Sequence, residues 1–434
     1  MISMALGSAS GQAVSVSESG SAHTGRALAV VTTLFFMWGF LTTLNDTLIP
    51  HLKQIFTLNF TEAMLVQFSF FGSYFIFAQP AGKLIEIIGY KRTMVVGLGV
   101  MALGVFLFLP AAGAQSYPFF LAAEIVLAAG VTALQVAANP YVTVLGPAQT
   151  ASSRLNLTQA FNSLGTVIAP LFGSAFILAS AAEMARMTKQ EQATSLKLPY
   201  AGIGIMLLIL AIAIALVKLP RIQATREFRT TGDADNPMGS IWSHRHVWLG
   251  AIGIFAYVGA EVAIGSSLVN YMEHADIGAF SAQRANAYLI FYWGGLMVGR
   301  FAGSAILQRV RTGPLVGCFA IVAACLVVIS MLSFGHLAMW SMLLVGLFNS
   351  IMFPSIFTLG TAQMGPLTGK ASGLLVQAIV GGAIIPLGQG AIMDRIGIHH
   401  GFILPVLCYL FIIYYGFLGS RPTGAKAELV ATEA

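Results

Sequence analysis

The sequence has few charged residues, since Asp, Glu, Lys and Arg make up only 9% of its 434 residues. Soluble domains carry about 25% charged residues, so this composition excludes a water-soluble globular protein. Only three cysteines are present, all inside apolar runs, which predicts small buried side chains rather than a disulfide scaffold. The sequence also lacks a Gly-rich phosphate loop ending in Lys-Ser or Lys-Thr, and it lacks His-Glu-x-x-His. We therefore expect no ATP-driven motor and no enzyme.

Long apolar segments take the place of charge, and 57% of the residues are hydrophobic. About 20 apolar residues span a bilayer core, and their backbone groups must be paired within the segment, which predicts helices. Strands of a β-barrel would instead be alternating segments of about ten residues. The sequence therefore predicts an all-α membrane protein with twelve transmembrane helices. We place these helices at 27–51, 63–85, 94–113, 118–144, 156–180, 199–217, 247–272, 284–306, 314–332, 337–361, 371–393 and 399–418.

The positive charges are distributed unevenly between the two sides of the predicted membrane. Sixteen of the 22 Lys and Arg residues, with Arg300 counted among them, fall on one side, and six fall on the other. Because positive loops stay cytoplasmic, we expect both termini to face the cytoplasm of a bacterial inner membrane. The charges are scattered over short loops rather than gathered on one face, so we expect no nucleic-acid partner.

The two halves of the chain resemble each other across a polar middle segment. Ala-Gly recurs near the end of the second predicted helix at 81–82 and near the end of the eighth at 302–303, and Arg-Thr recurs at 92–93 and 311–312. Such weak repetition is expected of transporters built from two pseudo-symmetric six-helix bundles. The predicted division is a disordered cytoplasmic tail at 1–25, an N-terminal bundle at 26–217, a cytoplasmic linker at 218–246, a C-terminal bundle at 247–420 and a cytoplasmic tail at 421–434.

Two carboxylates lie inside predicted membrane helices, and a carboxylate is not expected on a surface that faces lipid. Asp46 is in the first helix and Glu261 is near the middle of the seventh, at nearly equivalent places in the repeat. A charge at a helix centre costs about 2.5–3.5 kcal/mol on insertion scales, so such residues usually face a cavity or a partner. We predict that Asp46 and Glu261 couple transport to a cation. The alternative is a structural hydrogen bond between two helices.

Amide side chains also cluster near the middle of the membrane. Gln135 and Asn139 are four residues apart, and Gln159 and Asn162 are three apart, so each pair shares one helix face. Amides both donate and accept hydrogen bonds, which suits a neutral molecule with many hydroxyl groups. Amides also join neighbouring helices, so each residue alone fits a structural role equally well.

Aromatic side chains could supply the apolar surface that the C–H faces of a sugar require. Trp38 lies seven residues before Asn45, and Tyr257 lies four residues before Glu261. We predict a substrate site with contributions from both halves and without a metal. Its predicted members are Trp38, Asn45, Gln135, Asn139, Gln159, Asn162, Tyr257, Asn349 and Gln377.

Several longer stretches give the sequence a family likeness. These are residues 44–50 (LNDTLIP), 137–147 (AANPYVTVLGP), 154–163 (RLNLTQAFNS) and 257–261 (YVGAE), with GYKR at 89–92 as a weaker motif. Through them, residues 27–418 resemble the major facilitator superfamily, and within it the fucose permease and glucose/galactose transporter family.

This resemblance implies cation-coupled hexose uptake by alternating access. It also implies that Asp46 is a coupling carboxylate and that Asn162 contributes to the sugar site. The chain departs from fucose permease-like members at Gln135, where they carry a second essential Glu. Gln cannot take up a proton with the same chemistry, so Glu261 is the candidate replacement, a pattern that looks more like the glucose/galactose branch.

The sequence therefore predicts a symporter for a monosaccharide such as glucose, galactose, fucose or N-acetylglucosamine, driven by H⁺ or Na⁺. We expect no cofactor, and a monomer suffices for this function. One alternative is a drug/proton efflux antiporter, which would have an aromatic cavity with few amides. A nutrient receptor on a transporter fold is another, but it requires a long folded cytoplasmic extension.

Overall fold

The computed structural model describes residues 18–56, 60–114, 116–173, 188, 191, 197–224, 240–422 and 429–432. Helices dominate these residues. The first half contains α1 (Glu18–Phe56), α2 (Phe60–Ile88), α3 (Tyr90–Ala114), α4 (Tyr117–Val144), the short η1 (Ala148–Thr150), α5 (Ala151–Phe172) and α8 (Lys197–Leu216). Gly89 separates α2 from α3 with a φ of 80°, a conformation that costs glycine little.

The second half has shorter and more interrupted helices. It contains η5 (Ile241–Ser243), α9 (Arg245–Glu273), α10 (Ala282–Ile306), α11 (Thr312–Leu332), α12 (Gly335–Asn349), α13 (Met352–Gly360), η6 (Gly365–Leu367), α14 (Thr368–Gln377), η7 (Ala378–Val380), α15 (Gly381–Ile396), η8 (His400–Phe402), α16 (Ile403–Tyr414) and η9 (Tyr415–Gly419). Three predicted helices are therefore divided. The tenth becomes α12 and α13, the eleventh becomes α14, η7 and α15, and the twelfth becomes α16 with the π-helical η9.

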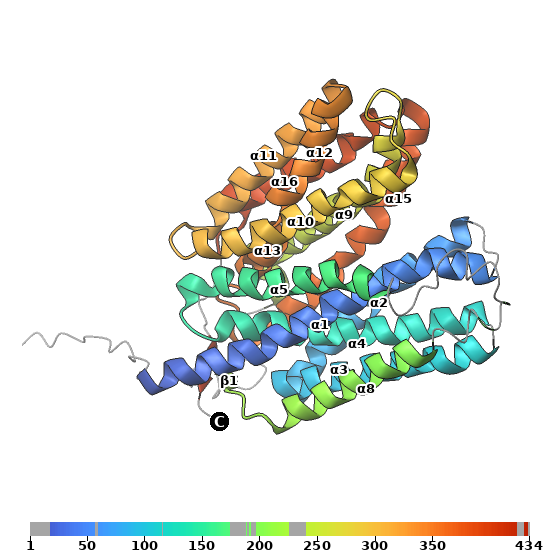
Figure 1. Ribbon diagram of the computed structural model, residues 1–434. Helices are drawn as coiled ribbons and strands as arrows, with labels where there is room; N and C mark the ends of the chain where they lie inside the picture. The colour runs from blue at the N-terminus through green and yellow to red at the C-terminus, as the bar shows by residue number, and fades with distance from the viewer. Residues whose placement is uncertain are drawn as a thin grey trace, which may run out of the picture.

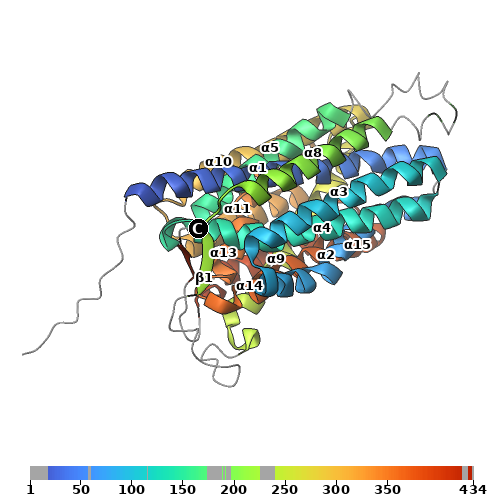
Figure 2. The same ribbon diagram turned by 90° about the horizontal axis from the view of Figure 1, so that it is seen from below.

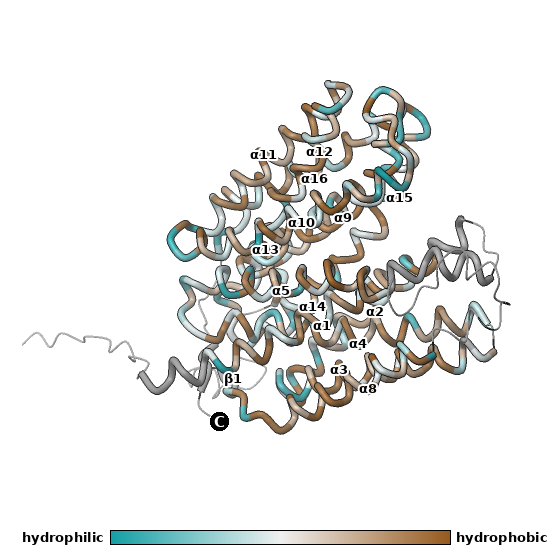
Figure 3. Tube along the Cα trace, in the orientation of Figure 1, coloured by the Kyte–Doolittle hydropathy of each residue, from teal (hydrophilic) through white to brown (hydrophobic). Residues whose placement is uncertain are grey.

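The helices form two groups, α1–α8 and α9–α16, which run side by side and diverge toward one end (Figure 1). Both ends of the described chain lie at the opposite end, which we call the terminal end; the diverging end is the far end (Figure 2). The helical segments are mostly hydrophobic, and hydrophilic residues gather in the connecting segments (Figure 3); many large hydrophobic side chains of the helices are exposed. This pattern is that of a multi-pass membrane protein.

Ten helical segments of the described residues are long and apolar enough to cross a membrane. Helix α5 is too polar to be among them, because it carries buried serines and amides such as Ser153, Asn156 and Gln159. It lies against α1 on one side and against α10 and α13 on the other. Its polar side chains therefore face protein rather than lipid, as polar groups inside a membrane require.

A short two-stranded ribbon was not expected from the sequence. β1 (Arg221–Ala224) follows α8, and β2 (Leu429–Thr432) comes from the C-terminal segment that was predicted to be a tail. The strands pair antiparallel, with Arg221 opposite Thr432. Four residues give too weak a pattern to predict a strand, and the pairing depends on bringing the two halves together.

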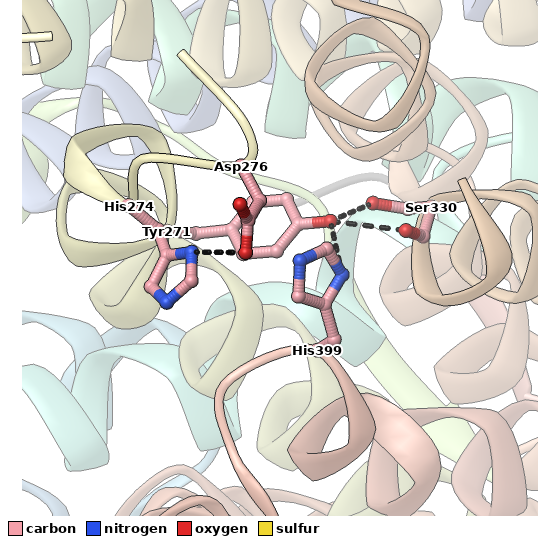
Figure 4. A network of polar contacts seen from close by, with 5 residues as sticks. All are labelled: Tyr271, His274, Asp276, Ser330 and His399. Atoms are coloured by element: carbon pink, nitrogen blue, oxygen red, sulfur yellow. Dashed lines mark hydrogen bonds and ion pairs between the residues drawn. The ribbon is translucent and has the colours of Figure 1, made fainter. Parts of the chain in front are cut away.

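A polar cluster joins α9, α11 and the connection that follows α15 at the far end of the second group (Figure 4). The Tyr271 hydroxyl, on α9, donates to the Ser330 carbonyl oxygen of α11 at 3.0 Å and lies 3.5 Å from Nδ1 of His399. His274 Nδ1 lies 3.6 Å from a carboxylate oxygen of Asp276. The Asp276 carbonyl oxygen accepts from the Gly335 amide at 2.8 Å. These contacts hold the far ends of α9, α11 and α15 and their connecting segments together.

The cluster predicts a pH dependence of stability. Partial burial, together with the neighbouring His274, lowers the pKa of His399. The unfolded chain therefore binds more protons than the folded one below about pH 6.5, so acid destabilises the fold. We expect His399→Gln to reduce the loss of Tm between pH 7 and pH 5 by about 1–2 °C. Differential scanning fluorimetry in detergent measures this. His336→Gln, at an exposed position of α12, is the control, and an equal effect there would contradict the prediction.

Candidate functional site

The polar face of α5 is held close to α1 by glycine. A Cβ added at Gly39 would overlap the carbonyl oxygen of Asn162, so only glycine fits at this crossing. The resulting proximity lets Asn162 Nδ2 donate to the Phe35 carbonyl oxygen at 2.9 Å. Asn162, a predicted substrate ligand, is thereby oriented by the backbone of α1.

Three helices of the first group meet at a second polar point. Gln135 of α4 donates through Nε2 to the Tyr74 hydroxyl of α2 at 2.7 Å, and Trp38 of α1 also interacts with that hydroxyl. All three side chains are buried. The structure thus brings together two of the predicted site residues, Trp38 and Gln135, through a tyrosine that the sequence analysis did not select.

Several predicted amides keep unpaired polar atoms although they are buried. Within the described part of the chain, these atoms are Oε1 of Gln135, both polar atoms of Asn139 and Nε2 of Gln159. A buried polar group without a partner costs about 1–3 kcal/mol, so such groups normally find water or a ligand. These three side chains therefore have hydrogen-bonding capacity left for a bound polar molecule.

Glu261 belongs to a network inside the second group. The Tyr257 hydroxyl donates to Glu261 Oε1 at 2.9 Å, and the Tyr292 hydroxyl donates to the Glu261 carbonyl oxygen at 3.2 Å. Asn349 continues the network, since it donates to the Tyr292 hydroxyl at 3.1 Å and accepts from the Tyr409 hydroxyl at 2.8 Å. Tyr257 and Asn349 are fully buried, whereas Glu261 remains partly accessible.

Arg300 is the residue that the sequence analysis placed wrongly. It was counted with the cytoplasmic charges, but it is buried in α10 where that helix meets α5. Its Nη1 donates to Ser163 Oγ at 2.6 Å and to the Gln159 carbonyl oxygen at 3.2 Å. Its charge also acts on Glu261. The available signal was an Arg within a predicted membrane span, which by itself indicates a functional site.

The remaining predicted residues have other surroundings. Gln377 of α14 accepts from Gln79 Nε2 at 3.1 Å and donates to the Phe75 carbonyl oxygen at 3.0 Å, so it ties α14 to α2. Asn45 and Asp46 lie in α1, but their side chains are outside the described residues. Their predicted roles stay predictions.

The two groups of helices are joined from the middle of the molecule to the terminal end. Ser153 Oγ donates to the Ser304 carbonyl oxygen at 2.6 Å, and Lys370 Nζ lies 3.7 Å from a Glu86 carboxylate oxygen. Among the described residues, two contacts between the groups lie nearest the far end. They are the hydrogen bond of Arg300 to Ser163 and that of Gln377 to the Phe75 carbonyl oxygen. The two groups are therefore in polar contact on the terminal side of the polar site.

The contact of Arg300 with α5 predicts a measurable coupling. Charge-assisted hydrogen bonds contribute about 1.5–3 kcal/mol, so Arg300→Ala and Ser163→Ala should destabilise the protein non-additively by about that amount. A double-mutant cycle from unfolding of the detergent-solubilised protein measures it. Pairing Arg300→Ala with Ser73→Ala, a buried serine that bonds within α2, provides the control. Equal coupling in both cycles would contradict a direct contact.

The sequence profile of the Major Facilitator Superfamily matches residues 27–386. The glucose/galactose transporter of Brucella abortus biovar 1 (strain 9-941) is 50% identical over 92% of this chain and 95% of its own length. The crystal structure of the Escherichia coli fucose:proton symporter has a TM-score of 0.81 and 32% identity, covering 92% of this chain and 100% of that one.

A second crystal structure of the same transporter, in the outward conformation, has a TM-score of 0.80 and 34% identity. It covers 91% of this chain and 98% of that one. The profile and these relatives each span most of the sequence, and the two-group helical fold is the same in both crystal structures. The chain belongs to the Major Facilitator Superfamily.

Proposed function

We propose that this protein is a cation-coupled symporter that imports a monosaccharide by alternating access. The observation that carries the proposal is the set of buried amide atoms without partners, on Gln135, Asn139 and Gln159, beside the contact between the two helical groups. A neutral polyol supplies alternating donors and acceptors that match such atoms. The relative with 50% identity is named a glucose/galactose transporter, which favours a hexose.

The proposed coupling groups are Glu261 and Asp46. Glu261 accepts a hydrogen bond from Tyr257 and interacts electrostatically with the positive charge of Arg300. Arg300 in turn donates a hydrogen bond to α5 of the other group. Binding of a cation or proton at Glu261 would therefore change the balance of charge at the junction of the groups. Coupling requires such a ligand to favour one conformation over the other.

The conformation fits a carrier that is open toward the far end. If the basic loops face the cytoplasm, the terminal end, where the groups are in polar contact, is the cytoplasmic one and the far end faces outward. Alternating access would break the ties at Ser153–Ser304 and Glu86–Lys370 and close the far end instead. We propose a bacterial inner-membrane location, cytoplasmic termini and a monomer that carries a complete site. Drug efflux is not favoured, because it would require an aromatic cavity with few amides, whereas several buried amides here have polar atoms without partners.

Transport by the purified protein in vesicles tests the function and identifies the ion. Labelled glucose or galactose is offered first with a sodium gradient at clamped pH and then with a proton gradient without sodium. We expect uphill accumulation under one of the two gradients, because a symporter uses only the gradient of its coupling ion. Accumulation under neither gradient, in vesicles with folded protein and with each hexose of a panel, would overturn the proposal.

Charge-neutral variants test the coupling groups separately from sugar binding. We expect Asp46→Asn and Glu261→Gln to lower the sugar accumulation ratio to about one, since an uncoupled carrier only equilibrates its substrate. Sugar exchange should continue, because the amide in Glu261→Gln retains an oxygen that accepts from Tyr257. Glu273→Gln, at an exposed position near the end of the same helix, is the matched control. Undiminished uphill uptake by either site variant would remove that carboxylate from the mechanism.

A further inference from the structure

A large cavity lies at the terminal end of the first group, away from the site described above. Its volume is about 1030 Å³. It is bounded by the α2–α3 connection, the first turns of α3, the end of α8 and the segment that leads into β1, with Tyr141 of α4 at its side. It therefore opens where the helices pass from the membrane into water.

The cavity is basic. Lys91, Arg92 and Lys218 line it, and the described residues of its lining include no acidic side chain. Glu86 on α2 is outside the lining; its carboxylate lies 3.7 Å from Lys370 Nζ of the other group and also acts electrostatically on Tyr90 of the lining. Among the described residues, Arg92 and Lys218 form no salt bridge, and both are exposed. Because Lys91 and Arg92 lie in the first turn of α3, the positive end of the helix dipole adds to their field.

One of the three cations has a structural role as well. Lys91 Nζ donates to the Ala215 carbonyl oxygen in the last turn of α8 at 2.9 Å, which joins α3 to α8. An ammonium group has three donors, so Lys91 keeps donors for a further acceptor. The cations of the cavity are thus held near one another by the junction of two helices.

The other walls of the cavity are apolar and continue onto the lipid-facing surface. Val95, Val96, Leu219 and Ile222 line it. Val96 is 41% exposed, and Leu216, which follows the lining residue Ala215 on α8, is 78% exposed. The Tyr141 hydroxyl donates to the Pro220 carbonyl oxygen at 2.9 Å, in the manner of tyrosines at a membrane interface.

We propose that this cavity binds the headgroup of an anionic phospholipid, with the phosphate on Arg92, Lys218 and Lys91 and an acyl chain along Val96 and Leu216. Basic pockets between helices at the membrane surface are typical sites for such lipids. A soluble anion would use the cations but not the apolar exit toward the bilayer. The bound lipid would link α3 to residues 219–222, which begin the connection between the two groups. This inference depends on the membrane-spanning helices and not on the transported substrate.

Native mass spectrometry of the full-length protein tests the lipid preference. Dioleoyl-phosphatidylglycerol and dioleoyl-phosphatidylcholine have the same acyl chains and differ in headgroup charge. We expect phosphatidylglycerol to be retained at lower concentration and to raise the Tm, whereas phosphatidylcholine is not. Equal retention of both lipids would overturn the proposal. Inorganic phosphate is added as a competitor, and displacement of the lipid by equimolar phosphate would assign the cavity to a free anion instead.

Matched variants locate the lipid. We expect Arg92→Gln/Lys218→Gln to weaken phosphatidylglycerol binding about thirtyfold, from about five- to sixfold per lost cation. Lys91 is left unchanged because it joins α3 to α8. The control is Arg309→Gln/Arg311→Gln, two exposed cations at the same end of the second group. Similar losses in both double variants would mean non-specific attraction and overturn the proposal.

A further variant places a negative charge at the apolar exit without removing a cation. Val96→Glu places a carboxylate at the exposed edge of the cavity and should weaken the lipid about as much as the loss of one cation does. Because Val96 is partly exposed, this change leaves the packing of α3 in place. Unchanged phosphatidylglycerol binding by folded Val96→Glu would place the lipid elsewhere.

Discussion

The buried guanidinium of Arg300 is the interaction on which the arrangement of the two helical groups depends. A charge inside a membrane protein must be satisfied by protein partners, and these come from α5 and from the Ser350 carbonyl oxygen of its own group. The contact holds α5 against α10 and brings a positive charge toward Glu261. In the proposed mechanism, a change of charge at Glu261 would act on this junction, which must separate in alternating access.

The hydrogen bonds of the interior divide its polar residues into two kinds. Asn349 and Gln377 have both ends of their amides occupied by protein, so they hold helices together. Gln135 and Asn139 keep atoms without partners, which leaves them available to a substrate. A transporter needs both kinds, because its substrate contacts must be exchangeable while its helical groups stay rigid.

The two ends of the molecule are stabilised by different means. At the terminal end, hydrogen bonds and the Glu86–Lys370 pair cross between the groups. At the far end, the Tyr271 cluster joins elements of the second group only, so that group is rigid where it stands apart from the first. The proposed lipid adds a third attachment, which links the connection between the groups to the membrane surface.

The sequence by itself determined the class of protein, the positions of the helices and the family. Long apolar segments must form helices in lipid, and the stretches around Asn139 and Gln159 carry the family likeness without reference to a structure. The sequence could not assign partners, because Arg300 and Ser163 are 137 residues apart and meet only when the groups dock. Only the tertiary structure decided which amides form hydrogen bonds between helices and where the two strands pair. It also decided that a basic cavity forms between α3 and α8. Each of these depends on side chains whose neighbours come from distant parts of the chain.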